Sequence, residues 1–304
     1  MKVAIVGAGY VGLPLAQVFA EAGSEVVLVD VERQVVDGIN RGESHIEDVP
    51  SAELAPLVER GAVRATTDYD VLADVDAIVI ALATPLTKQR EPDLSIVTTA
   101  VTGIAERLRA GQLVVLESTT YPGTTREVVQ PILEELSGLR AGKDFHLAFS
   151  PERVDPGNDT WSARTVPKIV GGITPECTRR AADLYGSAVD TVHPVSSPEA
   201  AELTKLLENI FRSVNIALVN ELAQLCERMG IDVWEVVDAA ATKPFGFMRA
   251  SSPVPASAAT ASPSTPSTSP GRRGSTASRP SSLSWPERST RECPTTAARS
   301  SRRR

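Results

Sequence analysis

Three glycines near the N-terminus have the spacing of a phosphate-binding turn. Gly7, Gly9 and Gly12 follow the short apolar run Lys2 to Val6 and open a segment of helical periodicity, Leu13 to Ala22. In such a turn the first glycine permits a tight bend, the second lets the backbone approach a pyrophosphate, and the third allows close helix–strand packing. The helix N-terminus adds free N–H groups and the positive end of its dipole. The spacing in this context predicts a dinucleotide site, and a glycine-rich turn without a ligand is the alternative.

A carboxylate at the end of the next apolar run indicates which dinucleotide is bound. Asp30 directly follows the run Glu25 to Val29. An acidic residue at this place accepts hydrogen bonds from the hydroxyls of the adenosine ribose. Because the same carboxylate repels a 2′-phosphate, we predict NAD rather than NADP as the cofactor.

Further polar residues lie directly after two other apolar runs, with Thr84 and Pro85 after Ala77 to Leu82, and Ser118 and Thr119 after Leu113 to Leu116. In open α/β sheets the loops at the carboxyl ends of the strands form the ligand crevice. We therefore predict that these hydroxyls and the exposed backbone line a nicotinamide site. Ordinary turn chemistry explains the composition as well.

Two charged segments are candidates for acid–base and electrostatic chemistry. Glu152 belongs to a loop, residues 149–158, in which charged side chains and two prolines indicate a fixed polar surface. Lys205 and Asn209 are four residues apart in a helical pattern, so they share one face and could stabilise an oxyanion. The alternatives are a solvated loop and a helix-surface pair.

The elements that must position these residues alternate between strand and helix. The uninterrupted Val/Ile/Leu runs, with His146 to Phe149 and Lys168 to Val170 as further strands, predict an N-terminal Rossmann fold with a doubly wound parallel sheet. From Glu199 to Met229 apolar residues recur every three or four positions, which predicts a long central helix that Gly230 ends. A second helical segment is expected at Val233 to Ala241. A helix of this length predicts a domain link or a dimer seam.

Composition divides the chain into three parts: a Rossmann-like domain at 1–196, a helical dimerisation region at 197–248, and a tail at 249–304 that we expect to be disordered. The tail is almost entirely Ser, Thr, Pro, Ala and Arg. It holds ten arginines and two acids, which leaves 21 basic and 36 acidic residues in the first 248. The acidic balance argues against a nucleic-acid partner. No apolar run approaches membrane-spanning length, no cysteines have metal-ligand spacing, and a cytoplasmic protein is expected.

Taken in order, these motifs resemble the UDP-glucose/GDP-mannose dehydrogenase family over residues 1 to about 248. The matching residues are Gly7 to Gly12 with Tyr10 and Val11, Thr84-Pro85, Ser118-Thr119, Ser150 to Arg153, and Glu202 through Lys205 to Asn209. The stretches from Glu152 to Asn158 and from Lys243 to Phe247 resemble the branch that acts on N-acetylated sugars. The resemblance implies a homodimer acting on a UDP-sugar. UDP-N-acetylglucosamine is the first choice, UDP-N-acetylmannosamine the second, and UDP-glucose a further alternative.

The resemblance also implies a double oxidation that supplies surface-polysaccharide precursors. The C6 alcohol of the sugar becomes an aldehyde and then a carboxylate, while two NAD are reduced. Thr119 and Glu152 would order water and act in acid–base steps, and Lys205 and Asn209 would stabilise the oxyanion at C6. A family cysteine would hold the aldehyde as a thiohemiacetal until the second hydride transfer. The cofactor would contact Gly7, Gly9, Tyr10, Val11, Gly12, Asp30, Thr84, Pro85, Ser118 and Thr119.

The family cysteine is missing from its expected place shortly after Phe247. There the family has Gly-Gly-His-Cys and then a second Rossmann-like domain that binds UDP. The family-like peptide Gly-Gly-His-Cys-Ile-Pro-Ile-Asp-Pro-Phe-Tyr-Leu-Thr-Trp-Lys, written in GC-rich codons and read one nucleotide out of register, yields the run of residues 259–272. Residues 284–290 likewise back-read to Glu-Leu-Ala-Gly-Glu-Ile-Asn. We predict a single insertion or deletion near codons 248–250, by sequencing error or in a pseudogene, and an inactive chain.

Two other functions compete with this interpretation. One is a non-catalytic NAD-binding or regulatory protein whose basic tail contacts nucleic acid. The other is a 6-phosphogluconate or hydroxyacid dehydrogenase, which shares the Rossmann start and a long central helix. The loop from Ser150 to Asn158 and the Lys205–Asn209 pair argue against the second alternative.

Overall fold

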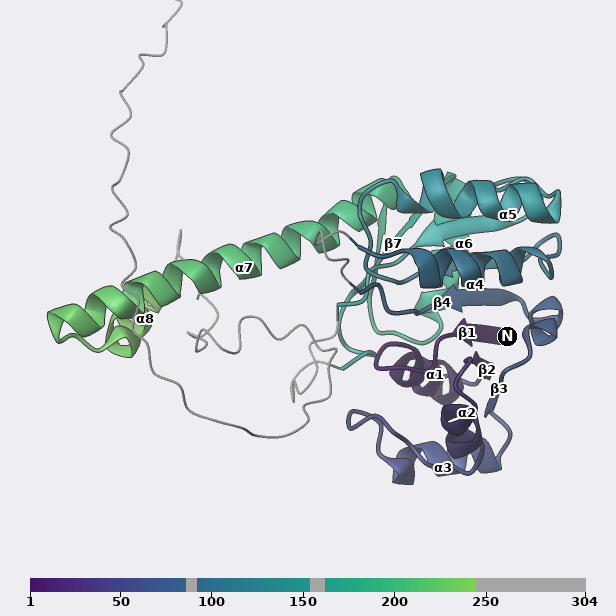
Figure 1. Ribbon diagram of the computed structural model, residues 1–304, viewed down its shortest axis with the longest axis horizontal. Coiled ribbons are helices and arrows are strands. Elements are labelled where there is room, and N and C mark those ends of the chain that lie inside the picture. The colour runs from purple at the N-terminus through teal and green to yellow at the C-terminus, as the bar shows by residue number, and fades with distance from the viewer. Residues whose placement is uncertain (86–91, 154–161, 244–304) are drawn as a thin grey trace, which may run out of the picture. The chain divides into compact units, whose positions relative to one another are not determined.

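The structure is a computed structural model that describes residues 1–85, 92–153 and 162–243. In these residues one sheet has eight strands in the order β3-β2-β1-β4-β5-β6-β7-β8 (Figure 1). The strands are β1 (Lys2–Val6), β2 (Glu25–Val29), β3 (Val63–Thr66), β4 (Ala77–Ile80), β5 (Leu113–Leu116), β6 (His146–Phe149), β7 (Lys168–Gly172) and β8 (Val192–Val195). The predicted doubly wound α/β fold is confirmed, and the division at residues 196 and 248 stays a prediction.

Helices cover both faces of the sheet because successive strand residues point to opposite sides. Val3 and Ile5 belong to one buried cluster, which packs against α1 (Gly12–Glu21), α2 (Arg33–Asn40), α3 (Ser51–Glu59) and α6 (Pro175–Gly186). Ala4 and Val6 belong to the other, with η1 (Tyr69–Asp74), α4 (Ser95–Ala105), η2 (Thr125–Val129) and α5 (Gln130–Ser137). Burial on both faces explains why the central strands read as continuous apolar runs.

Two strands, β7 and β8, run against the other six. All neighbouring strands pair in parallel except β6 and β7, which are antiparallel with Ala148 opposite Gly172 and Phe149 opposite Gly171. The sequence predicted a parallel sheet, and for β7 and β8 this was wrong. The reversal brings the amino end of β7 to the edge of the sheet where β1, β4, β5 and β6 end.

The two edge strands, β3 and β8, were not predicted from the sequence. In β3 exposed and buried residues alternate, so this strand shows no continuous apolar run. In β8 no residue is fully buried, and Pro194 lies inside it. A proline is tolerated there because an edge strand has unpaired backbone groups on one side. The edge strands show weak apolar patterns in the sequence because they are less buried than the central strands.

The predicted long helix is confirmed as α7 (Pro198–Met229), followed by α8 (Val233–Ala241). The Ser197 hydroxyl caps its first turn by accepting from the Ala200 amide, and Gly230 ends it with a left-handed backbone. Only its first turns pack on the sheet, and the rest extends away with α8 beside its far end (Figure 1). Exposed apolar side chains follow its length: Leu203, Leu207, Ile210, Phe211, Val214, Leu218, Leu222 and Leu225. Among the described helices, none is long and apolar enough to cross a membrane.

Candidate active site at the carboxyl edge of the sheet

The glycine turn between β1 and α1 has the geometry its sequence predicts. Gly7 has a φ of +104°, and a Cβ there would lie 2.5 Å from the Ala81 carbonyl oxygen. A Cβ on Gly12 would lie 1.8 Å from the Gly7 carbonyl oxygen, so only glycine allows the helix to start here. Around Gly9 a Cβ would meet nothing within 4 Å. This open space beside the N-terminus of α1 fits the pyrophosphate of a dinucleotide.

Asp30 connects the end of β2 to this turn. Its Oδ2 accepts a hydrogen bond from the Ala8 amide at 2.7 Å, and its Oδ1 accepts from the Glu32 amide at 3.0 Å. An ionised carboxylate has about four lone-pair sites, so acceptor capacity remains for two ribose hydroxyls. Within the glycine turn, Tyr10 is exposed, whereas Val11 is half-buried against the core.

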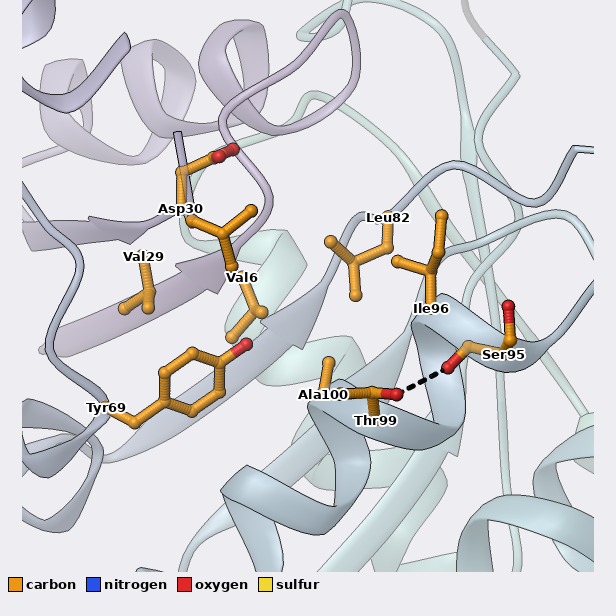
Figure 2. Close-up of a pocket in the computed structure, with 10 residues that line it drawn as sticks. Val6, Val29, Asp30, Tyr69, Leu82, Ser95, Ile96, Thr99 and Ala100 are labelled. Carbon is orange, nitrogen blue, oxygen red and sulfur yellow. Dashed lines mark hydrogen bonds between the residues drawn. The ribbon is translucent and has the colours of Figure 1, made fainter. Parts of the chain in front are cut away.

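A mostly apolar pocket of about 280 Å³ opens beside Asp30. Figure 2 shows its lining, which comes from the ends of β1, β2 and β4, from η1 and from the first turns of α4: Val6, Val29, Asp30, Val31, Tyr69, Leu82, Ser95, Ile96, Thr99 and Ala100. Burial raises the pKa of Tyr69, and the charge of Asp30 adds to the effect. An apolar slot with a carboxylate at its rim fits an adenosine.

The structure brings the two predicted hydroxyl loops together. Thr84 donates from Oγ1 to the Thr119 carbonyl oxygen at 2.6 Å, and Pro85 stabilises the same loop by accepting from the Asp93 amide. The Ser118 hydroxyl is buried and accepts from the Leu82 amide at 3.1 Å. Ser118 therefore holds the ends of β4 and β5 together, whereas the Thr119 side chain is exposed.

Glu152 lies in a buried cluster of charges that the sequence analysis missed. Lys168 Nζ is 3.0 Å from Glu117 Oε1 and 3.1 Å from Glu152 Oε2. Glu117 Oε1 also accepts from the Tyr185 hydroxyl at 2.5 Å. The four side chains come from the residue after β5, the loop after β6, the start of β7 and α6. The sequence feature that could have indicated this cluster is Lys168, a charged residue at the first position of an otherwise apolar strand.

Burial and mutual charge set the protonation of this cluster. Burial raises the pKa of the Glu117 carboxyl, although the Lys168 ammonium opposes the shift. Burial by itself would lower the pKa of Lys168, but the charges of Glu117 and Glu152 outweigh it and raise the pKa above its usual value. Burial raises the pKa of Tyr185, and the negative charge of Glu117 raises it further. Lys168 is therefore a permanent cation and Tyr185 a neutral donor.

Helix α7 is anchored to the site through its first turns. Glu202 is buried and accepts from the Gly123 amide at 2.6 Å, the Thr125 amide at 2.9 Å and the Thr125 hydroxyl at 2.7 Å. Glu199 receives a hydrogen bond from Arg126 at 2.7 Å. These contacts fix the helix against the loop that carries Thr119. Glu202 belongs to the residues that match the family pattern, but the sequence predicted no role for it.

The same face of α7 carries Lys205 and Asn209, which are both half-buried. Burial lowers the pKa of Lys205, while the nearby charge of Glu152 opposes the shift. Arg153 reaches α7 as well, with Nη2 at 2.7 Å from Glu208 Oε1. Lys205 is thus close enough to Glu152 for the two charges to interact, which fits the catalytic roles predicted for both residues. The catalytic and cofactor roles of the predicted residues stay predictions.

Several predicted features fall outside the described residues. They are Val154 to Asn158, Pro244 to Phe247, Cys293, and the tail at 249–304 with its expected disorder. Of the other cysteines, Cys177 and Cys226 are buried in helices α6 and α7 as free thiols. Neither lies among the residues of the candidate site. In the described part of the chain, no group of His, Cys, Asp or Glu could hold a metal ion.

A glycine turn at the head of a mostly parallel sheet, a carboxylate ending its second strand and a buried acid–base cluster define an NAD-type dehydrogenase domain. Residues 1–189 match the model of the UDP-glucose/GDP-mannose dehydrogenase family, NAD binding domain, and residues 199–261 match the family's central domain. The chain belongs to this family, and NAD is its cofactor. The resemblance drawn from the sequence is confirmed.

Named relatives share about the same identity with the chain. It is 38% identical over 245 residues to UDP-N-acetyl-D-mannosamine dehydrogenase of Pyrococcus horikoshii, covering 80% of this chain and 58% of the relative. It is 38% identical over 249 residues to UDP-N-acetyl-D-glucosamine 6-dehydrogenase of Pseudomonas aeruginosa, covering 82% and 58%. A solved structure of the Pyrococcus horikoshii enzyme superposes with a TM-score of 0.77, covering 82% of this chain and 60% of the other. The chain spans less than two thirds of the length of these relatives.

Proposed function

We propose that the intact gene product is an NAD-dependent UDP-N-acetylhexosamine 6-dehydrogenase that supplies precursors for surface polysaccharides. It oxidises the C6 alcohol of the sugar to a carboxylate with two NAD, which accept the hydrides when bound. UDP-N-acetylglucosamine is the preferred substrate in this proposal, UDP-N-acetylmannosamine is the second, and UDP-glucose is a further alternative. Relatives of both N-acetylated specificities are 38% identical to the chain, so identity favours neither.

The observation that carries the proposal is the convergence of Glu152, Lys205 and the Thr119 loop at one edge of the sheet. Thr119 and Glu152 order water and exchange protons with the C6 oxygen. Lys205 and Asn209 stabilise the oxyanion that develops at C6. Burial around Lys205 strengthens this electrostatic contribution because it reduces screening by water.

We further propose that the printed chain is inactive because a frame shift near codons 248–250 removed the cysteine and the UDP-binding domain. The out-of-register match of residues 259–272 is the support for this proposal. The stretch 255–261 extends it, since Pro-Ala-Ser-Ala-Ala-Thr-Ala back-reads to Pro-Gly-Val-Gly-Gly-His-Cys. Resequencing must cover codons 245–265, which include both the proposed frame shift and residue 261, where the match to the family's central domain ends. A single-nucleotide difference there identifies a sequencing error, whereas an unchanged sequence identifies a pseudogene.

NADH absorbance tests both proposals when the 304-residue chain and the frame-restored protein are assayed side by side. The restored protein is expected to form two NADH per UDP-N-acetylglucosamine, and the printed chain none. Replacing the restored cysteine by serine should remove the second oxidation. UDP-N-acetylmannosamine and UDP-glucose are the comparison substrates. Turnover by the printed chain refutes the frame shift, while a restored protein that is inactive on all three sugars refutes the assigned reaction.

Dimerisation through α7 is part of the same proposal. The exposed apolar stripe of α7 lacks a cover in the described residues, and a second copy would bury it. Light scattering on the frame-restored protein should give twice the chain mass, and Leu207→Glu with Val214→Glu should give the monomer. A monomeric wild-type protein at high micromolar concentration contradicts the proposal. Cytoplasmic localisation and the absence of a nucleic-acid partner stay predictions.

A further inference from the structure

Lys168 reaches the candidate site only because β7 is antiparallel to β6. The reversal places the first residue of β7 at the edge of the sheet where β5 and β6 end. Its backbone is fixed there by the amide hydrogen bond to Thr191 at 2.9 Å. Its side chain is 5% exposed, so the ammonium has no route to solvent as an alternative to the cluster. Lys168 is therefore a fixed cation behind Glu152.

Both carboxylate oxygens of Glu152 are held by this arrangement. Oε2 accepts from Lys168 Nζ at 3.1 Å, and Oε1 accepts from the Arg153 amide at 2.7 Å. The side chain of Glu152 is 16% exposed. Two hydrogen bonds from fixed donors define the plane of the carboxylate as well as its position. Such preorganisation is what a group that transfers protons requires.

A second cross-link reinforces the first. Arg153 donates from Nη1 to the Pro167 carbonyl oxygen at 2.7 Å, one residue before Lys168. The same guanidinium pairs with Glu208 on α7, one turn after Lys205. Glu152 and Arg153, which are adjacent in the loop after β6, thus bind Lys168 and Pro167, which are adjacent at the start of β7. The position of Glu152 relative to α7 depends on this connection.

The far side of Lys168 is held by Glu117 and Tyr185. Glu117 Oε1 lies 3.0 Å from Nζ and receives the Tyr185 hydroxyl, while the tyrosine ring centroid lies 5.4 Å from Nζ. Two carboxylates so close in a buried space repel each other strongly unless a cation separates them. Lys168 provides that cation.

We propose that Lys168 is a positioning residue for the dehydrogenase reaction, which fixes the orientation of the Glu152 carboxylate and lets it coexist with Glu117 as a second buried anion. This inference rests on the proposed function, because it assigns Glu152 an acid–base role. Lys168 does not itself touch the substrate. Its contribution is to keep one carboxylate geometry available through both oxidation steps.

Kinetics of the frame-restored enzyme test the inference directly. Lys168→Met should lower kcat about 100-fold, the size of effect expected from misplacing a catalytic group, and should leave KM for NAD and the UDP-sugar within about threefold. Lys168→Arg, which keeps the charge, should recover much of kcat. Arg164→Met is the matched control, since Arg164 forms an exposed ion pair with Asp190 and should change neither constant. An unchanged kcat in Lys168→Met overturns the proposal.

The double variant Glu117→Gln with Lys168→Met separates positioning from charge balance. It removes one charge of each sign, so the folding defect of Lys168→Met should be relieved. The value of kcat should stay low, because the Lys168 ammonium that orients Glu152 Oε2 is still absent. Recovery of kcat together with stability would mean that Lys168 only neutralises Glu117, and the proposal would be wrong.

A spectroscopic measurement on the 304-residue chain is independent of activity. With ¹³C-labelled glutamate, infrared spectra of Lys168→Met at pH 7 should contain one more protonated carboxyl than wild type, because the two facing carboxylates then share a proton. The band should disappear in the double variant. Its absence in Lys168→Met overturns the coupling of Lys168 to Glu152. An inactive restored enzyme with the band present refutes the reaction instead.

Discussion

Two ionic clusters in this protein have similar distances and very different surroundings. In the buried cluster Lys168 lies 3.0 and 3.1 Å from Glu117 and Glu152, whose side chains are 0% and 16% exposed. On the outer face of α6, Arg179 lies 2.6 Å from Glu176, and these side chains are 58% and 45% exposed. Shorter distances do not make the outer cluster the stronger one, because water screens it and the free side chains lose entropy on pairing. Burial decides which cluster matters for folding and function.

Removing the buried cation should reduce stability more than any substitution in the exposed cluster. Lys168→Met leaves Glu117 and Glu152 as uncompensated buried acids, and breaking such a network costs about 3–5 kcal/mol. Urea denaturation of the 304-residue chain should show a lower midpoint with an unchanged slope. Lys143→Met, at an exposed turn, serves as the control. A loss below about 1 kcal/mol would contradict the assigned difference between buried and exposed clusters.

Glu202 tests whether burial also makes a carboxylate important for stability when its hydrogen-bond partners are backbone amides. Glu202→Ala leaves the Gly123 and Thr125 amides without their acceptor, and each unsatisfied buried donor costs about 1–3 kcal/mol. The two amides together give an expected loss of about 2–6 kcal/mol, which is comparable to the loss for Lys168→Met and measurable by urea denaturation. Glu199→Ala is the neighbouring control, since its ion pair with Arg126 is partly exposed. Equal effects of the two substitutions would show that burial is not the deciding factor.

Asp30 should affect ligand binding as well as folding, because it also accepts a hydrogen bond from the Ala8 amide. Asp30→Ala is expected to weaken NAD binding by about 1–2 kcal/mol if two hydrogen bonds to the ribose are lost. It should also reduce discrimination against NADP, because the repulsion of the 2′-phosphate disappears. Calorimetry with both cofactors on the full chain measures the two effects. Equal or tighter binding of NADP by the wild-type chain would refute the assigned role.

The exposed cluster should give the smallest effect and a different pH dependence. Hydrogen bonds from Arg179, and then Arg180, lower the pKa of Glu176 from 4.5 to about 2. Because this pKa is lower in the folded state, its contribution is present above pH 4.5 and is lost as the pH falls towards 2. Because water screens this exposed pair, Glu176→Gln should lower the unfolding midpoint only slightly at pH 7, and less still at pH 2. A large shift at pH 7 would mean that the cluster is not screened by water.

Local sequence patterns predicted the parts of the site that belong to one turn or one strand end. Gly7 and Gly12 are required by backbone geometry within six residues, Gly9 leaves open space between them, and Asp30 is recognised by its place after an apolar run. The pairing of Thr84 with the Thr119 loop followed from the rule that strand ends meet at one edge. By contrast, Lys168 has no local mark other than its charge.

The sequence by itself determined the alternation of elements, the dinucleotide turn and the long helix, because periodicity and glycine spacing act over a few residues. Tertiary structure alone decided that β7 runs backwards and that Lys168 therefore joins Glu117 and Glu152. It also decided that Glu202 binds the Gly123 turn, 79 residues earlier in the chain. The physical reason is that strand direction and the desolvation of distant charges depend on the packing of the whole sheet. No short stretch of residues encodes them.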